Sequence, residues 1–179
     1  MSALSGIFTR ARLAGLAIAL GIFALDQWVK KFVTQDLGVD QLGDVYPLIS
    51  FFDLRYAENF GVSMGMFTAE TMELRWILVG VTALIALGVF VWMMREKATG
   101  DILALSLVLG GALGNIMDRY SLGYVVDYAD FHIGDWRPFF IFNLADAAIT
   151  VGVVILLARS LLMGDKTKKE PAAQAAAET

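Results

Sequence analysis

The sequence has no cysteine, only one histidine and few charged residues for its 179-residue length. The absence of cysteine excludes a thiol nucleophile, a disulfide framework and a Cys-ligated metal. With His132 as the single histidine, a His-rich metal site and a His-based catalytic triad are both disfavoured. Charged residues make up 18% of the chain and hydrophobic residues 58%, with a mean hydropathy of +0.64. Because ordinary soluble domains carry more charge, we interpret the chain as an integral membrane protein with one compact bundle.

Four apolar stretches are long enough to cross a bilayer as helices, at about residues 12–33, 74–94, 102–118 and 138–159. The first uncharged run, Leu13–Leu25, is too short alone, so its helix must continue through Asp26 and Trp28. Lys30 and Lys31 can then snorkel to the far interface. Asp26 either pairs with Lys30 one turn later or helps to shape a site. A removable signal peptide is the alternative for this segment, but no small-x-small cleavage motif follows it.

Positive charge predicts the orientation of these spans. Arg10 and Arg12, the Arg95–Lys97 turn and the basic segment after residue 158 all fall on one side of a four-span protein. By the positive-inside rule both termini are cytoplasmic, and the acidic stretch Thr34–Glu73 lies outside. Residues 1–164 are therefore predicted to form one membrane-embedded domain, followed by a disordered cytoplasmic tail at 165–179.

The outer region, about residues 36–73, contains two β-prone runs, Val45–Ile49 and Phe51–Tyr56, which predict a small strand pair or cradle. Asn59–Phe67 either rests on the membrane surface or caps the bundle. A further short strand is predicted at Gly123–Asp130. The predicted fold class is a membrane all-α bundle of four transmembrane helices, with a small extracytoplasmic β-cradle and a surface amphipathic segment.

Two acids, Asp127 and Asp146, lie on opposite sides of a turn around Gly134–Pro138. This connection can fold back and bring them to one depth, with Asp146 about 12 Å inside the fourth span. Two adjacent carboxyls in a low-dielectric site share one proton, and such a pair can activate water and protonate a leaving amine. Asp127 could instead be a solvated strand residue, as we expect for Asp130 and Asp135. A lone acid well inside a span, such as Asp146, is functional by default.

Three donors, Asn115, Arg119 and Asn143, could orient a peptide carbonyl or a lipid phosphate or ester. Each Asn could instead form a hydrogen bond between helices, and Arg119 could be an interfacial anchor paired with Asp118. The glycines of Gly110–Gly114 would let neighbouring helices approach closely.

Five motifs in succession are DQWVK (Asp26–Lys30), NFGVSMG (Asn59–Gly65), GGALGNIMDR (Gly110–Arg119), GYVVDY (Gly123–Tyr128) and FNLADAAI (Phe142–Ile149). In this order and spacing the chain resembles the bacterial lipoprotein signal peptidase (signal peptidase II) family. The resemblance implies a plasma-membrane aspartyl protease with four transmembrane helices, a β-cradle and a surface helix. Such an enzyme removes the signal peptide of prolipoproteins by cutting before a cysteine that carries diacylglycerol.

The resemblance also implies which residues form the site. Asp127 and Asp146 would be the catalytic pair, and the residues lining or supporting them would be Asp26, Lys30, Asn59, Gly61, Asn115, Arg119 and Asn143. It implies no metal or other cofactor, with a lipid-modified prolipoprotein and membrane lipids as partners and no nucleic acid. We expect a monomer in the bacterial inner membrane, with its active site near the extracytoplasmic face. Met64 stands where the family has an aromatic residue, which leaves the packing of the Asn59 loop open.

The rival interpretation is a small proton-coupled carrier that uses Asp26 and Asp146 as relay sites. It would need acids spread through the membrane depth, whereas the inner halves of the predicted spans contain none. An assembly scaffold, the third possibility, would leave these charges without a use.

Overall fold

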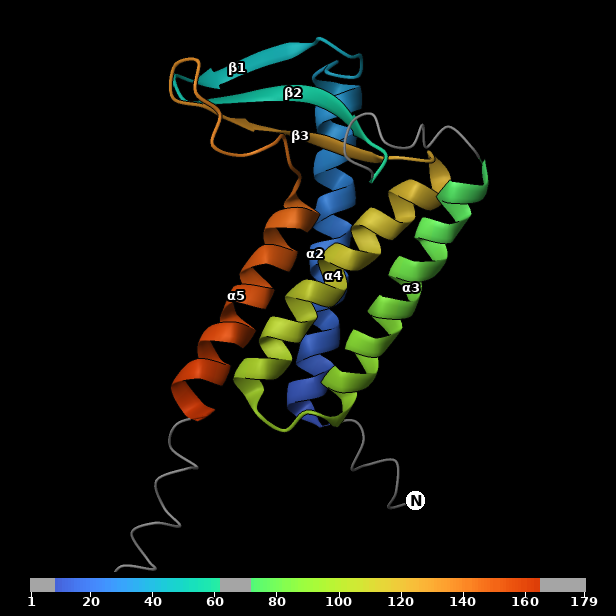
Figure 1. Ribbon diagram of the computed structural model, residues 1–179, viewed down its shortest axis with the longest axis vertical. Coiled ribbons are helices and arrows are strands. Elements are labelled where there is room, and N and C mark those ends of the chain that lie inside the picture. The colour runs from blue at the N-terminus through green and yellow to red at the C-terminus, as the bar shows by residue number, and fades with distance from the viewer. Residues whose placement is uncertain (1–8, 62–71, 165–179) are drawn as a thin grey trace, which may run out of the picture.

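The computed structural model describes residues 9–61 and 72–164, and in this part of the chain four long helices form a bundle (Figure 1). They are α2 (Arg10–Lys31), α3 (Met72–Arg95), α4 (Thr99–Ser121) and α5 (Leu144–Gly164). A π-helical turn, η1 (Phe32–Asp36), continues α2. All four are long and apolar enough to cross a membrane. Helix α4 packs against each of the other three, so it occupies the centre of the bundle.

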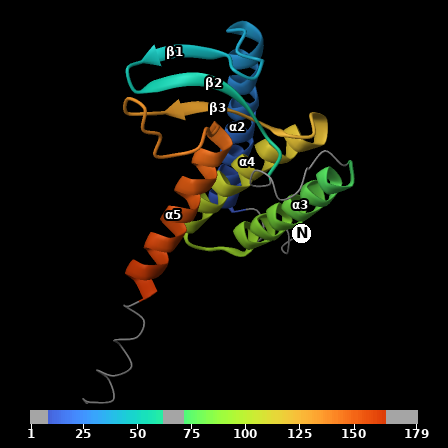
Figure 2. The same ribbon diagram turned by 45° about the horizontal axis from the view of Figure 1, so that its top comes forward.

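Three strands form an antiparallel sheet in the order β1-β2-β3. They are β1 (Val45–Ile49), β2 (Phe52–Asn59) and β3 (Val125–Phe131). The sheet lies across one end of the bundle, which we call the sheet end (Figures 1 and 2). The strand pair and the third strand predicted from the sequence are confirmed. Residues 62–71, which include most of the predicted surface segment and Met64, and the predicted tail at 165–179 lie outside the described residues.

An apolar cluster fixes the sheet to the end of α2. Val33 of η1 and Val39 pack with Leu54 of β2 and with Val126 and Tyr128 of β3, and all five side chains are buried. Because burial of each such side chain contributes about 1.5–3 kcal/mol, this cluster holds β3 in place above the helix ends.

Two glycines of α4 permit the close helix packing predicted for the Gly110–Gly114 segment. A methyl group on Gly111 would collide with the backbone carbonyl of Ala145 in α5. One on Gly114 would collide with the carboxylate of Asp26 in α2. Glycine at these positions therefore brings α2 and α5 close to α4 at the depth where polar side chains gather.

The structure corrects two of the predicted span boundaries. Helix α4 begins at Thr99 and includes Asp101, which forms an ion pair of 2.6 Å with Arg159 of α5. The expectation that the inner halves of the spans lack acids is therefore wrong, since Asp101 lies at the end far from the sheet (Figure 1). Helix α5 begins at Leu144 instead of residue 138, because the backbone of Phe142 is hydrogen-bonded to β3 at Ala129.

Candidate active site

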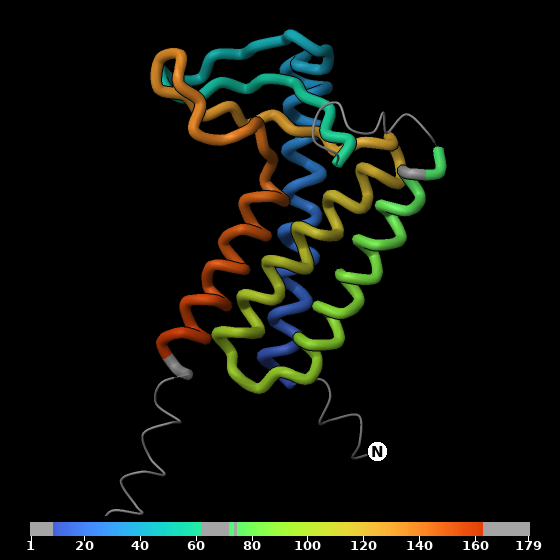
Figure 3. The backbone as a smooth tube through the Cα atoms, viewed as in Figure 1, coloured from blue at the N-terminus to red at the C-terminus, as the bar shows by residue number. Residues whose placement is uncertain are grey.

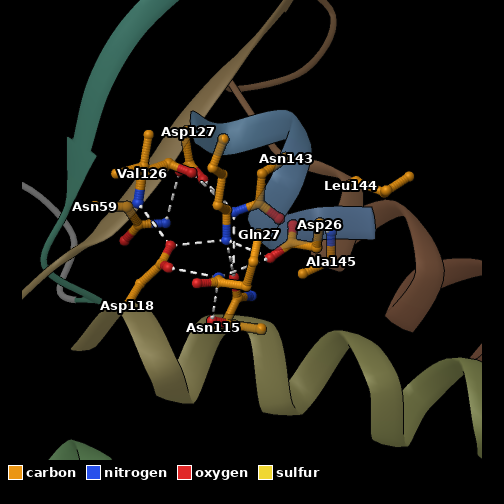
Figure 4. Close-up of polar contacts among 12 residues, drawn as sticks. Asp26, Gln27, Asn59, Asn115, Asp118, Val126, Asp127, Asn143, Leu144 and Ala145 are labelled. Atoms are coloured by element: carbon orange, nitrogen blue, oxygen red, sulfur yellow. Dashed lines mark hydrogen bonds and ion pairs between the residues drawn. The ribbon is translucent and has the colours of Figure 1, made fainter. Parts of the chain in front are cut away.

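Polar side chains converge where α2, α4 and α5 meet β3 beneath the sheet (Figure 4). Several are almost inaccessible to solvent: Asp26 and Asn143 are 0% exposed, Asp127 3% and Lys30 4%. Buried polar groups are costly unless they are hydrogen-bonded or paired. The structure satisfies these groups mainly with one another, so they form one connected network.

Asn143 and Asp146 cap the start of α5 reciprocally. The Asp146 backbone N–H donates to Asn143 Oδ1 at 2.8 Å, and the Asn143 backbone N–H donates to Asp146 Oδ2 at 3.3 Å. This is the geometry of a capping box, with Asn143 at the N-cap and the acid three residues later. Asp146 therefore lies in the first turn of α5, and the prediction that it lies about 12 Å inside a span is wrong.

The same Asn143 side chain reaches the second carboxyl group. Its Nδ2 donates to Asp127 Oδ1 at 2.7 Å, while Asn59 Nδ2 donates to the other Asp127 oxygen at 3.0 Å. Asn115 Nδ2 donates to Asp146 Oδ1 at 2.7 Å, and Asn143 Nδ2 also lies 3.2 Å from Asn115 Oδ1. Asn143 thus joins the carboxyl groups of Asp127 and Asp146 through side-chain and backbone hydrogen bonds.

Asp127 lies on β3, outside the helices, and its pKa is raised. Burial has the largest effect, and the nearby negative charge of Asp146 adds to it. The hydrogen bonds from Asn59 and Asn143 oppose the shift, and the resulting pKa of Asp127 is about 7. A carboxyl with this pKa still holds its proton close to neutral pH.

Lys30 forms ion pairs with two further carboxylates of the network. Its Nζ lies 2.8 Å from Asp26 and 2.7 Å from Asp118, and 3.4 Å from Asn115 Oδ1. The prediction that Lys30 snorkels to the interface is wrong, because it turns inward to these acids. The suggested pairing of Asp118 with Arg119 is also wrong, since Asp118 pairs with Lys30. The predicted i,i+4 pair of Asp26 and Lys30 is confirmed.

Asp26, Asp118 and Tyr128 also fix the backbone next to Asp127 and Asp146. Asp26 Oδ1 accepts from the N–H of Ala145 at 3.0 Å, and Tyr128 Oη accepts from the N–H of Leu144 at 3.2 Å. With the capping box, side chains thereby satisfy the first N–H groups of α5, which a helix cannot bond internally. Asp118 Oδ2 accepts from the N–H of Val126, the residue before Asp127, at 3.2 Å.

Gln27 and Asp118 were not identified as site residues from the sequence. Gln27 Nε2 donates to Asp118 Oδ1 at 2.8 Å and also contacts Asp26. A signal was present, because Asn115 and Asp118 are three residues apart and so share a helix face with each other. Gln27 follows Asp26 directly in the sequence, but nothing about a single glutamine marks it as part of a network.

Arg119 and Gly61 lie at the edge of the network. Gly61 has φ +79°, a conformation that L side chains rarely adopt, and its N–H donates to Asn59 Oδ1 at 2.8 Å. A Cβ at this position would lie 3.6 Å from an Arg119 Nη atom. Arg119 Nε is buried and has no hydrogen-bond partner among the described residues. Its positive charge lies near the carboxyl groups of Asp146 and Asp127.

Asp130 is not the solvated residue that we predicted. It is 1% exposed, and its carboxylate is 3.1 Å from the Nε atoms of both Arg55 and Arg137. Asp135, by contrast, is exposed as expected. His132 contacts Asp53, with 3.2 Å between Nε2 and Oδ2. No group of three or more His, Cys, Asp or Glu side chains in residues 9–61 and 72–164 is arranged to hold a metal ion.

The fold and site together define a class: a four-helix membrane protein with a small sheet at one end and linked carboxyl groups beneath that sheet. Residues 18–162 match the family model described as signal peptidase (SPase) II. The chain belongs to the signal peptidase II family.

Individual relatives agree with this assignment. The chain is 55% identical over 152 residues to a lipoprotein signal peptidase of Sphingopyxis alaskensis, covering 85% of this chain and 87% of the relative. It is 36% identical over 157 residues to that of Escherichia coli O157:H7, covering 87% and 93%. A bacterial membrane enzyme solved by the in meso method at 2.3 Å has a TM-score of 0.70 and 26% identity, covering 87% of this chain and 91% of that one. A second, solved at 1.9 Å, has a TM-score of 0.69 and 29% identity, covering 83% and 92%.

Proposed function

We propose that this protein is an intramembrane aspartyl endopeptidase that removes the signal peptide from prolipoproteins by cleaving before a diacylglyceryl-modified cysteine. Membership in the signal peptidase II family supports the reaction, and the relatives above are named lipoprotein signal peptidases. The observation that carries the chemistry is the connection of Asp127 and Asp146 through Asn143. Two carboxyl groups held in this way can divide the roles of acid and base.

We assign the resting proton to Asp127, and its raised pKa supports this choice. Asp146, as the carboxylate, takes a proton from a water molecule whose oxygen attacks the scissile carbonyl carbon. Asp127 gives its proton to the carbonyl oxygen. When the tetrahedral intermediate collapses, the C–N bond breaks and the amine takes the proton held by Asp146. The hydroxyl of the intermediate returns a proton to Asp127, so both groups regain their starting states.

Neighbouring donors position the reacting groups. Asn59, Asn115 and Asn143 hold the carboxyl oxygens by the hydrogen bonds described above. We assign Arg119 to the substrate, because its buried Nε lacks a protein partner among the described residues and a guanidinium binds carbonyl or ester oxygens well. Gly61 allows the chain to turn beside this guanidinium without a side chain in between.

Asp26 and Lys30 act as positioning residues. Asp26 holds the N–H of Ala145 at the start of α5, and Lys30 holds Asp26 and Asp118 together. Neither needs to touch the scissile bond for its loss to matter, because small displacements of reacting groups reduce rates strongly.

The proposed orientation places the sheet end outside. Arg10, Arg12, Arg95 and Lys97 are at or near helix ends far from the sheet, which the positive-inside rule assigns to the cytoplasm (Figure 1). The site would then lie near the extracytoplasmic face of the bacterial inner membrane, within reach of a lipid-modified substrate, and both termini would be cytoplasmic. We propose that the protein acts as a monomer, since the site is built from one chain.

The test is cleavage in reconstituted liposomes. The purified protein should release the signal peptide from a diacylglyceryl-modified prolipoprotein and leave an unmodified control intact. Asp127→Asn and Asp146→Asn should each reduce cleavage by at least about 10³-fold while retaining the folded state, by analogy with other paired catalytic groups. Asp135→Asn, at an exposed acid, should cleave normally. Equal cleavage by the first two variants and the wild type would refute the assignment, and proton-dependent solute flux would favour the carrier.

A further inference from the structure

The loop between β3 and α5 exposes two large aromatic side chains. Phe140 is 93% exposed, more than any other large hydrophobic side chain in the described residues, and Phe139 beside it is 63% exposed. Single exposed apolar residues are common on proteins. Two adjacent exposed aromatic rings beside a membrane span, by contrast, indicate a surface that contacts something other than water.

This exposure is not a result of a loosely held loop. Arg137 at its start is bound to Asp130, with Nε 3.1 Å from each carboxylate oxygen. Phe142 at its end is hydrogen-bonded to Ala129 of β3 in both directions, at 2.8 and 3.2 Å. The chain between these two points is short, so the fold itself keeps the rings of Phe139 and Phe140 at the surface.

The position of the loop indicates what covers it. The loop descends from the sheet to the sheet end of α5, outside the bundle (Figures 1 and 3). Its apolar surface is continuous along the chain with α5, whose exposed residues below include Val151, Val154 and Leu157. At the same end of the bundle Trp28 and Trp76 are also exposed. Trp rings gather at the boundary between hydrocarbon and headgroups, Phe side chains favour the hydrocarbon, and cationic side chains such as Arg137 suit the headgroup level.

We propose that the loop of residues 137–141 inserts Phe139 and Phe140 into the outer leaflet of the bilayer and anchors the sheet to the membrane surface. The partner is the lipid interface itself. Because Phe140 is three residues before Asn143, this anchor fixes the depth of the capped start of α5, and with it Asp146. The assignment to the outer leaflet rests on the orientation proposed above, and the inference does not depend on proteolytic activity.

Site-directed spin labelling tests this directly, because the chain has no native cysteine. Phe140→Cys and Phe139→Cys would each carry one nitroxide in full-length protein in liposomes of phosphatidylethanolamine and phosphatidylglycerol. Collision with oxygen, which concentrates in hydrocarbon, is compared with collision with a water-soluble nickel chelate. Leu157→Cys on the exposed face of α5 is the lipid control, and Gln41→Cys, in the turn before β1, is the water control (Figure 1).

The expected result is an oxygen-to-nickel collision ratio at position 140 several-fold above that at position 41 and close to that at 157. The ratio at position 139 should also lie above that at position 41 and close to that at 157. Either loop position can therefore serve as the test if the other variant folds poorly. Nickel accessibility at both loop positions equal to that at position 41 would overturn the proposal. Spin–spin broadening that grows with the protein-to-lipid ratio would also overturn it, by showing that a second copy covers the loop.

Discussion

Raising the pH through 7 is expected to remove the proton from Asp127. Burial beneath the sheet and the charge of Asp146 raise its pKa from the ordinary value of 3.8 to about 7. This difference of about 3 pK units corresponds to about 4 kcal/mol of preference for the protonated group in the folded protein. The folded state thus binds this proton more tightly than the unfolded state does. Its contribution to stability is complete below about pH 4 and is lost progressively as the pH rises to about 7.

Two measurements follow this titration. Infrared difference spectroscopy of the reconstituted protein should show a protonated carboxylic acid that disappears with a midpoint near pH 7. The Asp127→Asn variant should lack that signal. Proteolysis of a lipid-modified substrate should fall about tenfold per pH unit above 7, because the acid in the proposed mechanism loses its proton.

The stability of the variant gives an independent check. The amide introduced by Asp127→Asn has one acceptor oxygen, whereas Asn59 and Asn143 each donate to a separate oxygen of Asp127, so the substitution loses one hydrogen bond at every pH. On top of this constant cost, the wild type should lose stability relative to Asp127→Asn between pH 4 and 7. Parallel stability curves for the two proteins, together with an infrared midpoint near pH 4, would refute the reasoning.

Three substitutions test the packing around the site. Gly114→Ala should lower the free energy of unfolding by about 1–3 kcal/mol, because its methyl group meets a carboxylate of α2; Gly21→Ala, in open space, should not destabilise the protein in the same thermal unfolding assay. Asp118→Asn should cost roughly 1.5–3 kcal/mol by weakening the ion pair of Lys30, and unchanged stability would contradict that pairing. Asn143→Ala should cost about 1 kcal/mol of helix capping and abolish cleavage; normal cleavage would exclude a role for this amide.

Hydropathy and charge predicted the helices and their number within the described residues, because a span requires a long apolar run whatever its neighbours are. Short β-prone runs likewise predicted the three strands. The start of α5 was wrong because it depends on a tertiary contact. Residues 138–142 are as apolar as a helix requires, but the backbone of Phe142 is hydrogen-bonded to β3 at Tyr128 and Ala129, which keeps it out of the helix.

Individual polar residues were harder to place. Asp146 was identifiable because a lone acid within an apolar run is unusual. Lys30 was expected at the interface, since its inward direction depends on where Asp118 of a distant helix lies. Asp130 was expected in water, since its burial depends on Arg55 from another strand and on Arg137 beyond the strand end. Pairings between distant segments decided these positions, and sequence spacing within one segment does not encode them.

The reciprocal cap at Asn143 and Asp146 limits how this protein can admit a substrate. The hydrogen bonds that begin α5 also fix the carboxyl group of Asp146. Unwinding even the first turn of that helix would therefore move this carboxyl group away from Asp127. A movement that opens the site is therefore expected to leave the start of α5 in place. The end of β2, which contacts the site through the hydrogen bond from Asn59 to Asp127, is not held by this cap. A compound that competes for the two hydrogen bonds of that cap would act by unfastening a helix end, a mode of inhibition that does not require it to imitate the peptide.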